Sequence, residues 1–395
     1  MSLHLPALIM LILVVILPDL WLSYRLNLRR PHWICHVLLW LPGILSLIGF
    51  ILLSTRANNI SHPVILKQAA WFFTVFALIY IPKLVFVIFH LLNSLICHLT
   101  HSRFKLFTYI GAACSLALFV ILLIGATHTR KNIVVKEIEI THPNLPQEFD
   151  GLRIAHITDQ HIGNWGQDTT FIAKVVNTIN QQAPDIICTT GDMVNNFACE
   201  ITPFIPIWQR LKAPLGKYAV LGNHDYGDYT TWETPQARNA NLEATKQHIR
   251  NSGFNLLLNQ HTLITQGTDT LYIAGVENWG KPPFPQYGNL SKTMEDIPQN
   301  AFTILLSHDV SHWRGEVIGH PNIPLTLSGH THAAQMGIIC HNIKISPASW
   351  IYKEWDGLYQ QNDQYLYVNH GLGFIGMALR IGVPPEITLI TLRRE

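Results

Sequence analysis

Acidic residues are almost absent from the first third of this 395-residue chain. The sequence before residue 130 has eight Lys or Arg residues and a single acid, Asp19, whereas the remainder has 19 basic and 24 acidic residues. The formal net charge of +2 therefore conceals a basic front and an acidic body. This difference in composition predicts two domains, residues 1–130 and residues 131–395.

The sequence also lacks the marks of a disulfide-stabilised or processed protein. Its six cysteines do not form a disulfide framework, because three fall in or near long apolar runs and three are isolated later in the chain: Cys35, Cys97, Cys114, Cys188, Cys199 and Cys340. The first apolar run has no basic residue before it and no clear Ala-x-Ala site. We therefore interpret it as a retained segment and not as a cleaved signal peptide.

The first third of the chain consists largely of long apolar runs. Four of them are near or above the ~20 residues that a helix needs to cross a bilayer core: Leu3 to Leu22, Trp33 to Ser54, Ala69 to about Ile96, and Phe107 to Thr127. We therefore expect four transmembrane helices. Lys83 follows Pro82 inside the third run, and an intramembrane charge can mark a functional site. Because no acidic partner is evident beyond Asp19, we favour a kink with a snorkelling lysine.

The basic residues of the connecting loops give the orientation. Alternate sides of the membrane carry five basic residues each, which decides nothing by itself. The first helix usually dominates, and its flanking basic residues all follow it: Arg25, Arg29 and Arg30. We therefore place the N-terminus and the C-terminal domain outside the cytoplasm.

Five short polar motifs stand out in the remaining sequence. Each closes an apolar, β-rich run and is therefore expected at the exit of a strand: Asp159-Gln-His161, Gly191-Asp192, Gly222-Asn223-His224-Asp225, Ser307-His308 and Gly329-His330-Thr-His332. In open α/β sheets, ligands bind outside the carboxyl ends of the strands, so distant segments can meet there. Any one motif alone is as readily a core histidine or a helix cap, but all five in this order indicate one site.

The residue types in these motifs suit a pair of divalent metal ions. Imidazole, carboxylate and amide donors together favour Mn, Fe, Zn or Co over Ca or Mg, and no thiolate is offered. Two ions about 3.5–4 Å apart can clamp both oxygens of a displacement at phosphorus. Asp192 is the natural bridging carboxylate, because a short Asp at the end of a buried strand can present both oxygens. Asp159 with His161, and His330 with His332, are spaced to share one face of a strand; the alternative is that these motifs already lie in the turn.

Other patterns bear on the fold class. Apolar residues recur at helical spacing between Phe171 and Ile179, and a second helix is expected from Pro235 toward Asn251. With the strand-like runs, this periodicity predicts an α/β domain. The segment Gly371-Leu-Gly373-Phe-Ile-Gly376 matches a dinucleotide fingerprint, but no βαβ unit surrounds it, and we interpret it as a glycine turn near the cleft. Four further histidines fit no ligand spacing: His312, His320, His341 and His370.

With these motifs, residues from about 136 to 395 resemble the calcineurin-like metallophosphoesterase superfamily, specifically its bacterial branch of membrane-anchored phosphodiesterases. The resemblance implies a two-sheet β-sandwich flanked by helices. It further implies one metal held by Asp159, His161, Asp192 and His332, and a second held by Asp192, Asn223, His308 and His330. His224 corresponds to the catalytic imidazole, with Asp225 as its orienting partner. The sequence departs from the family pattern only between the ligands, at Gln160, Asp309, Ala333 and Ala334.

The resemblance implies a multi-pass enzyme of the bacterial inner membrane that hydrolyses a phosphodiester or pyrophosphate with a hydroxide bridging two metals. Relatives of the UDP-diacylglucosamine hydrolase type make a lipid-linked or nucleotide-linked substrate one candidate, and the expected partner is the lipid bilayer, not nucleic acid. The alternative is a non-catalytic metal-binding platform, or a sensor coupled to the membrane helices. Both the bridging aspartate and the catalytic histidine are present, which favours the enzyme.

Overall fold

The computed structural model describes residues 5–25, 33–57, 63–340 and 343–395, with side chains from Leu13 onward. His341, one of the histidines without a ligand spacing, lies outside the described residues. The chain divides into two compact units. The helical unit comprises Met1–Thr127 with Gly376–Leu379, and the C-terminal unit comprises His128–Ile375 with Arg380–Glu395.

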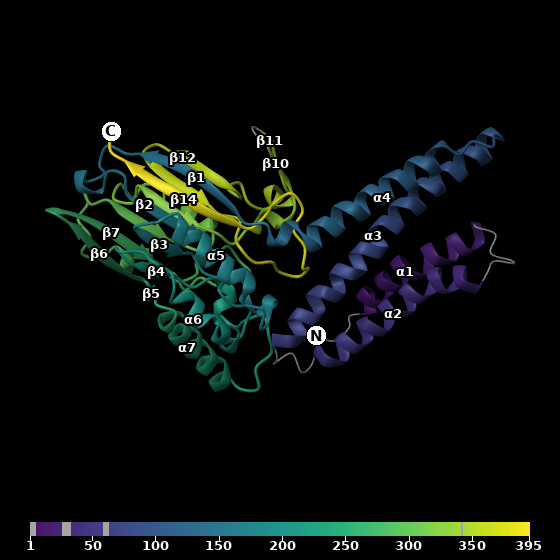
Figure 1. The fold of residues 1–395 in the computed structure, drawn as a ribbon, viewed down its shortest axis with the longest axis horizontal. Coiled ribbons are helices and arrows are strands. Elements are labelled where there is room, and N and C mark those ends of the chain that lie inside the picture. Colours follow the sequence, from purple (N-terminus) through teal and green to yellow (C-terminus); the bar gives the residue numbers. More distant parts are fainter. Residues whose placement is uncertain (1–4, 26–32, 58–62, 341–342) are drawn as a thin grey trace. The chain divides into compact units, whose positions relative to one another are not determined.

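The helical unit contains four long helices that coincide with the four apolar runs (Figure 1): α1 (Leu5–Arg25), α2 (Trp33–Ala57), α3 (Pro63–Thr100) and α4 (Leu106–Thr127). Three stretches of the described residues are long and apolar enough to cross a membrane, namely Trp33–Thr55, Pro63–Thr100 and Leu106–Lys131. The first side chains of α1 lie outside the described residues. A helix with the 38 residues of α3 is about 57 Å long at 1.5 Å per residue. It is therefore longer than a bilayer core is thick.

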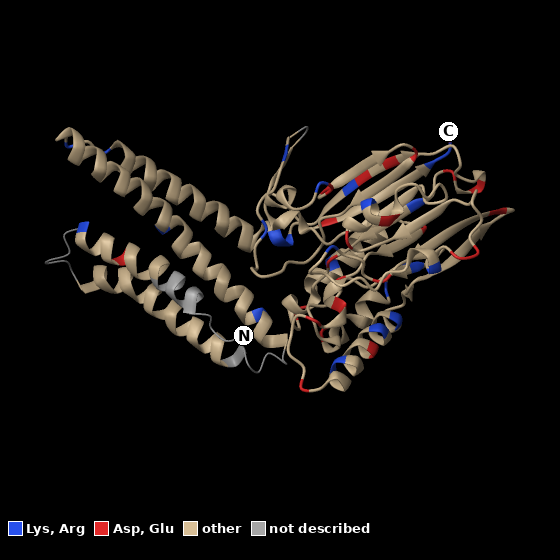
Figure 2. Ribbon diagram, turned by 180° about the vertical axis from the view of Figure 1, so that it is seen from behind, with Lys and Arg blue, Asp and Glu red and all other residues tan. Residues whose placement is uncertain are grey.

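Charged residues are scarce in the helical unit (Figure 2), yet two of them meet inside it. Lys83 Nζ forms an ion pair with Asp19 Oδ1, and the side chains are only 14% and 1% exposed. Tyr80 Oη donates to Asp19 Oδ2 over 3.5 Å. A Cβ at Gly43 would lie 2.9 Å from Tyr80 Oη, so the close approach of α2 requires glycine there. The expectation of a snorkelling Lys83 is therefore wrong: the residue pairs with the one acid of this part.

The C-terminal unit is a sandwich of two six-stranded mixed sheets, as the resemblance implied (Figure 1). The first has the order β1-β14-β2-β3-β4-β5, and the second has the order β12-β13-β9-β8-β7-β6. The strands of the first sheet are β1 (Val134–Thr141), β14 (Glu386–Arg393), β2 (Arg153–Ile157), β3 (Ile186–Thr189), β4 (Lys217–Ala219) and β5 (Asn255–Leu256). Those of the second are β12 (Gly357–Gln361), β13 (Gln364–Val368), β9 (Leu325–Ser328), β8 (Thr303–Leu306), β7 (Asp269–Gly275) and β6 (Gln260–Gln266).

Buried aliphatic side chains from both sheets form the core between them. Ile154 and Ile186 of the first sheet and Ile304 and Leu327 of the second belong to one buried cluster and are fully inaccessible to solvent. Burial of such a side chain contributes about 1.5–3 kcal/mol relative to an exposed position. The core therefore fixes how the two sheets lie against each other.

Helices and a small ribbon complete the C-terminal unit: α5 (Thr170–Gln181), α6 (Ile205–Trp208), α7 (Pro235–Asn251), α8 (Leu290–Thr293), and the antiparallel pair β10 (Ile338–Cys340) and β11 (Ile343–Ile345). The two expected helices are confirmed as α5 and α7. The buried residues of α5 are those of the expected apolar face: Phe171, Ile172, Val175, Val176 and Ile179.

Parallel pairing places the five motifs at one edge of the sandwich. In the first sheet β2, β3 and β4 are parallel neighbours. In the second sheet β7, β8 and β9 are parallel neighbours as well. Because carboxyl ends of parallel strands face the same way, the loops after β2, β3, β4, β8 and β9 can converge.

We expect the Asp19–Lys83 ion pair to behave as a buried unit. Lys83→Met leaves a buried carboxylate without its partner and should lower the stability by about 3–5 kcal/mol. The double change Asp19→Asn with Lys83→Met removes both charges and should recover most of that loss. Thermal unfolding of the detergent-solubilised full chain measures both effects. Arg103→Met, at an exposed loop position, serves as the control. Equal losses in the single and double variants would contradict a paired role.

Candidate metal centre

The five loops bring all seven expected metal-binding side chains together. Asp159 and His161 follow β2, and Asp192 follows β3. Asn223 follows β4, His308 follows β8, and the pair His330 and His332 follows β9. All seven side chains are buried, including that of His330, which is 6% exposed.

Most of these residues have a backbone conformation that the sequence did not suggest. Five have positive φ: Asp159 (50°), His161 (41°), Asp192 (53°), His330 (70°) and His332 (49°). They lie in turns beyond the strand ends, so the expected sharing of one strand face does not apply. Non-glycine residues in this left-handed region are strained by about 1–3 kcal/mol each and cluster at functional sites.

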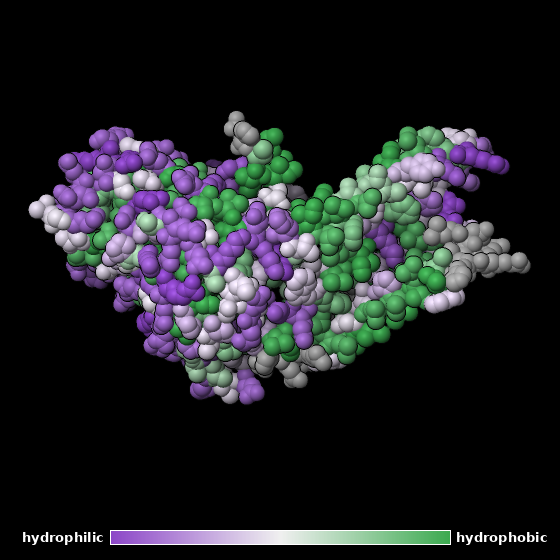
Figure 3. Space-filling view, in the orientation of Figure 1, coloured by the Kyte–Doolittle hydropathy of each residue, from purple (hydrophilic) through white to green (hydrophobic). Residues whose placement is uncertain are grey.

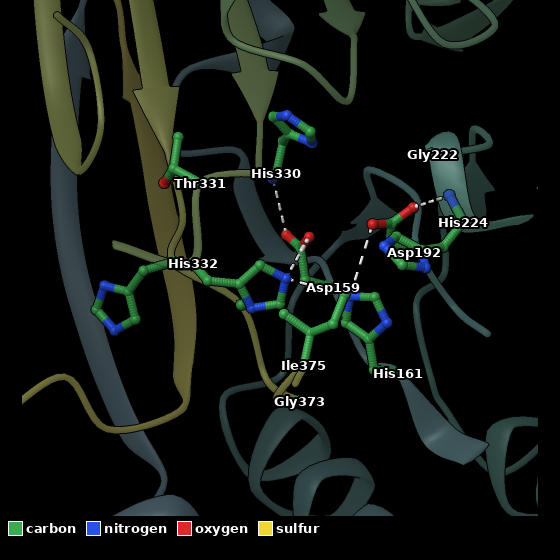
Figure 4. Close-up of polar contacts among 12 residues, drawn as sticks. Asp159, His161, Asp192, Gly222, His224, His330, Thr331, His332, Gly373 and Ile375 are labelled. Atoms are coloured by element: carbon green, nitrogen blue, oxygen red, sulfur yellow. Dashed lines mark hydrogen bonds and ion pairs between the residues drawn. The ribbon is translucent and has the colours of Figure 1, made fainter. Parts of the chain in front are cut away.

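One group of side chains contains Asp159, His161, Asp192 and His332 (Figure 4). His332 Nε2 lies 3.2 Å from Asp159 Oδ1, and His161 Nε2 lies 3.6 Å from Asp192 Oδ2. The two Nε2 atoms of His161 and His332 are 3.1 Å apart. Imidazole nitrogens and carboxylate oxygens thus converge on one small volume.

A second group contains Asp192, Asn223, His308 and His330. His308 Nε2 lies 3.3 Å from Asp192 Oδ2 and 3.1 Å from Asn223 Oδ1. His330 Nδ1 lies 3.0 Å from Asn223 Oδ1 and 3.3 Å from His308 Nε2. The same oxygen, Asp192 Oδ2, therefore faces a histidine of each group.

Hydrogen bonds from the surrounding chain select which ring nitrogen faces each group. His308 Nδ1 donates to the carbonyl oxygen of Thr190 over 2.7 Å, which leaves Nε2 for the site. His161 Nδ1 lies 3.1 Å from Asn195 Oδ1, which again directs Nε2 inward. His330 is reversed: Nε2 lies 2.9 Å from Tyr352 Oη, and Nδ1 faces the group. Such outer partners fix the tautomer and orientation of metal-binding histidines.

Burial and the neighbouring charges shift the protonation of these groups. Burial, together with His224, lowers the pKa of His161 to about 3, so this ring is neutral as a metal ligand must be. Burial alone would lower the pKa of His308, but the carboxylates of Asp192 and Asp159 raise it to about 10. Burial opposes ionisation of Asp192, yet His308 and His224 hold its pKa well below the usual range. A bound cation would replace the proton of His308.

The donor set fits divalent metals on two observations. Asp159 Oδ1 is a buried oxygen that makes no well-aligned hydrogen bond among the described residues, although it lies 3.2 Å from His332 Nε2. Buried polar atoms are normally hydrogen-bonded, so such an atom needs an explanation. In addition, the Nε2 atoms of His161 and His332, 3.1 Å apart, are both directed toward the Asp159 and Asp192 carboxylates, as ligands of one cation would be.

His224 and Asp225 differ from the expected pair. His224 Nδ1 donates to the carbonyl oxygen of Asn195 over 2.8 Å, and the ring lies 4.8 Å from that of His161. The Asp225 carboxylate instead accepts four backbone N–H groups, from Asp192 (2.8 Å), Met193 (2.9 Å), Val194 (3.2 Å) and Gly222 (2.9 Å). The geometry therefore corrects the role expected for Asp225: this residue holds the loop that carries Asp192 and does not orient the His224 ring.

Asn195 is a residue that the sequence analysis missed. Its side-chain oxygen contacts His161, and its backbone carbonyl accepts from His224. The backbone N–H of Asn195 donates to Glu200 Oε2 over 2.6 Å, and this bond holds the loop after β3 in place. The only feature of the sequence that could have identified Asn195 is its position three residues after Asp192. That spacing does not reveal which atoms Asn195 contacts.

Two glycine positions show how tightly the loops pack. A Cβ at Gly222 would overlap Asp192 Oδ1, and a Cβ at Gly373 would overlap the carbonyl oxygen of Gln160. Only glycine permits these approaches. The interpretation of residues 371–376 as a glycine turn near the cleft is confirmed, since Gly373 N–H donates to the carbonyl oxygen of Asp159 over 2.7 Å and a Cβ at Gly371 would lie 2.7 Å from Asp159 Cβ.

The other histidines without a ligand spacing lie away from the two groups. His312 is buried, 2.9 Å from Ser307 Oγ and 3.2 Å from Glu316 Oε2, and His320 is exposed. His370 Nδ1 lies 2.7 Å from Asp356 Oδ1 and 3.2 Å from Glu386 Oε2. His370 therefore belongs to a separate buried charge cluster, which the sequence did not indicate.

A cavity of about 430 Å³ opens beside the two groups. Its floor includes Asp192, Asn223, His224, His330 and His332, and its walls are Tyr229, Phe284, Tyr352 and Ile375. The Tyr229 ring lies 4.3 Å from that of His224, and the Phe284 ring lies 4.6 Å from that of His330. None of these wall residues belongs to a motif, because aromatic residues in loops carry no distinctive spacing.

The four hydrogen bonds of Asp225 lead to a prediction. Asp225→Asn places an N–H₂ group against backbone donors, so we expect a loss of about 1–3 kcal/mol in stability and weaker metal retention. Thermal unfolding and elemental analysis of the full chain measure these effects. Asp228→Asn, which alters an aspartate that pairs with Arg238 at 2.6 Å, is the control. Unchanged stability of Asp225→Asn would contradict the loop-holding role.

Comparison with known proteins agrees with this geometry. Residues 152–334 match a family model described as Calcineurin-like phosphoesterase, and residues 5–130 match one described as Probable Calcineurin-like phosphoesterase, transmembrane domain. The chain is 31% identical over 255 residues to the uncharacterized metallophosphoesterase YkuE of Bacillus subtilis (strain 168), covering 63% of this chain and 82% of that protein.

Two further relatives also carry the metallophosphoesterase region. A Danio rerio transmembrane protein with metallophosphoesterase domain is 26% identical over 269 residues, which span 66% of this chain and 57% of that protein. The UDP-2,3-diacylglucosamine pyrophosphatase LpxG of Chlamydia trachomatis serovar D is 28% identical over 348 residues, covering 72% of this chain and 98% of LpxG. The chain is a membrane protein that belongs to the calcineurin-like metallophosphoesterase family.

Proposed function

We propose that this protein hydrolyses a phosphodiester or pyrophosphate bond by means of two divalent metal ions. The observation that carries the proposal is the position of Asp192 Oδ2, which lies 3.6 Å from His161 Nε2 and 3.3 Å from His308 Nε2. One carboxylate oxygen between two sets of nitrogen and oxygen donors is what a shared pair of ions requires.

Each ion would have its own ligand set around this shared carboxylate. Asp159, His161 and His332 would complete one set, and Asn223, His308 and His330 would complete the other. Imidazole, carboxylate and amide oxygen without thiolate favour Mn, Fe, Zn or Co. When bound, such ions lower the pKa of a water nucleophile and neutralise charge on the phosphoryl oxygens.

The role proposed for His224 is proton transfer to the leaving oxygen. Its Nδ1–H is engaged by the carbonyl oxygen of Asn195, so Nε2 is the nitrogen that remains for the substrate. His224 lines the cavity beside Asp192 and carries a backbone N–H bond to Asp192 Oδ1 of 2.9 Å. This contact fixes the imidazole close to the Asp192 carboxylate. His224, His161 and Asp192 also bring ligand atoms within 4.8 Å of one another, so whether His224 acts as a ligand or as a proton donor is what the variants below decide.

A lipid-linked or nucleotide-linked substrate is the class we propose. The walls of the cavity are mostly aromatic or aliphatic, which suits an apolar or planar group next to the phosphate. The transmembrane helices hold the site near a bilayer, and one relative is named as a UDP-2,3-diacylglucosamine pyrophosphatase. The alternative is a metal-binding platform or sensor without turnover.

Three single variants test the enzyme against the platform. Asp192→Asn should lose metal and activity together, because an amide cannot supply two anionic donors. Asn223→Ala should lose metal as well. His224→Ala should keep its metals yet lose roughly 10²–10⁴-fold in turnover on a substrate with a poor leaving group. Elemental analysis and hydrolysis of alkyl and aryl phosphodiesters and a pyrophosphate, with the purified full chain, measure all of these effects.

The contrast between leaving groups is the internal control. An aryl leaving group needs little protonation, so its hydrolysis should suffer less in His224→Ala. If His224→Ala loses metal as Asn223→Ala does, His224 is a ligand and the proposed role is wrong. The platform would be favoured if the unchanged chain binds its metals but hydrolyses none of the substrates, and if none of the three changes alters phosphoesterase activity.

The site is further proposed to lie outside the cytoplasm, on a bacterial inner membrane. The basis is the group of arginines after the first helix, since positive charge is enriched in cytoplasmic loops. A reporter that is active only outside the cytoplasm, fused after Glu395, should therefore be active. Activity of a cytoplasmic reporter at the same position, with a silent external one, would invert the orientation.

A further inference from the structure

The short ribbon formed by β10 and β11 has an unusual outer face. In its antiparallel register Ile338 pairs with Ile345, and Cys340 pairs with Ile343. Paired residues and residues two apart share one face of a ribbon, so these four side chains lie together. The three isoleucines are 56–60% exposed. One whole face of the ribbon is therefore apolar and exposed.

The inner face explains why the ribbon keeps this position. Ile339, opposite Lys344, packs against the buried cluster that includes Ala333 and Trp355. Lys344 Nζ donates to the carbonyl oxygen of Asp356 over 2.9 Å and lies 3.4 Å from its carboxylate. The ribbon thus uses its inner face to attach to the domain, and the three isoleucines of the outer face are exposed.

Two residues that follow the ribbon extend this surface. Trp350 is 85% exposed and Ile351 is 77% exposed. Together with Ile338, Ile343 and Ile345 they are the five most exposed large hydrophobic residues among the described residues of the C-terminal unit. Figure 3 shows apolar side chains gathered on the β10–β11 ribbon. Large apolar side chains that are exposed in such number in one segment indicate an interaction site.

We propose that these five residues, the apolar ribbon surface, dock onto the surface of a lipid bilayer. A bilayer is always within reach, because the same chain carries the transmembrane helices. Tryptophan is enriched where protein meets the lipid headgroups. The segment Ala333–Lys353 contains no Asp or Glu, so no acidic side chain within it would repel anionic lipids.

The apolar ribbon surface is continuous with the candidate site. Tyr352 directly follows Ile351, lines the cavity, and lies 2.9 Å from His330 Nε2. Ser346 Oγ, at the end of β11, donates to the carbonyl oxygen of Ala333 over 2.7 Å, next to His332. Docking therefore places the cavity close to the lipid headgroups. A cavity in that position could receive a lipid-linked substrate directly from the bilayer. This consequence rests on the proposed function, whereas the docking itself does not.

Site-specific photocrosslinking tests the docking on the full chain. The chain is reconstituted in nanodiscs of phosphatidylethanolamine and phosphatidylglycerol, with benzoylphenylalanine in place of Trp350 or Ile345. The matched control carries it at Leu263, which is 54% exposed on β6, at the far edge of the second sheet. After illumination, mass spectrometry should find lipid adducts at positions 350 and 345 and none at position 263.

Every other outcome overturns the proposal. Crosslinks from position 350 to a second copy of the chain would assign the apolar ribbon surface to a dimer. Equal lipid adducts at 350 and 263 would mean general proximity without docking, and no adducts at 350 or 345 would exclude the bilayer as occupant. Adduct formation needs no turnover. Phosphodiester hydrolysis by the chain in the same nanodiscs is therefore a separate measurement, which shows whether the proposed function fails.

Discussion

The shared position of the Asp192 carboxylate is the constraint on which the rest of the candidate site depends. A buried carboxylate is costly unless it is paired, and here His161 and His308 approach one of its oxygens from two sides. The Asp192 backbone has positive φ, and the other oxygen accepts the His224 amide. Asp225 holds the same loop through four backbone N–H groups. The strain of the loop is thus offset by hydrogen bonds that leave the carboxylate facing the cavity.

The packing of the two sheets determines where the five ligand-bearing loops lie relative to one another. Three of the five loops follow strands of the first sheet and two follow strands of the second, so the ligands come from both layers of the sandwich. Hydrophobic packing between the layers, through residues such as Ile154 and Ile304, therefore sets the separation of the two ligand groups. Side chains in close-packed interiors transmit small displacements, so changes in this core reach the site although they touch none of its residues.

The sequence predicted the parts of the structure that local pattern determines. Strand-end polar motifs identified the side chains that converge, and the periodicity between Phe171 and Ile179 identified a helix. Contacts that depend on tertiary placement were not predictable. Nothing near Lys83 in the sequence indicated Asp19, because the partners are 64 positions apart. Likewise the family resemblance implied that Asp225 orients His224, whereas adjacent residues in the turn diverge and Asp225 contacts the backbone.

The surroundings of His330 connect the candidate site with the proposed membrane contact. His330 is the ligand candidate whose Nδ1 faces the site, and its Nε2 contacts Tyr352. Tyr352 is itself a wall of the cavity and directly follows the exposed pair Trp350 and Ile351 in the sequence. A residue that both orients a histidine and continues an apolar surface is affected by what that surface touches. Attachment by transmembrane helices limits how far the C-terminal unit can move from the bilayer but does not fix its orientation. A second, apolar contact would supply that orientation, and with it a defined distance between the phosphoryl position and the lipid headgroups.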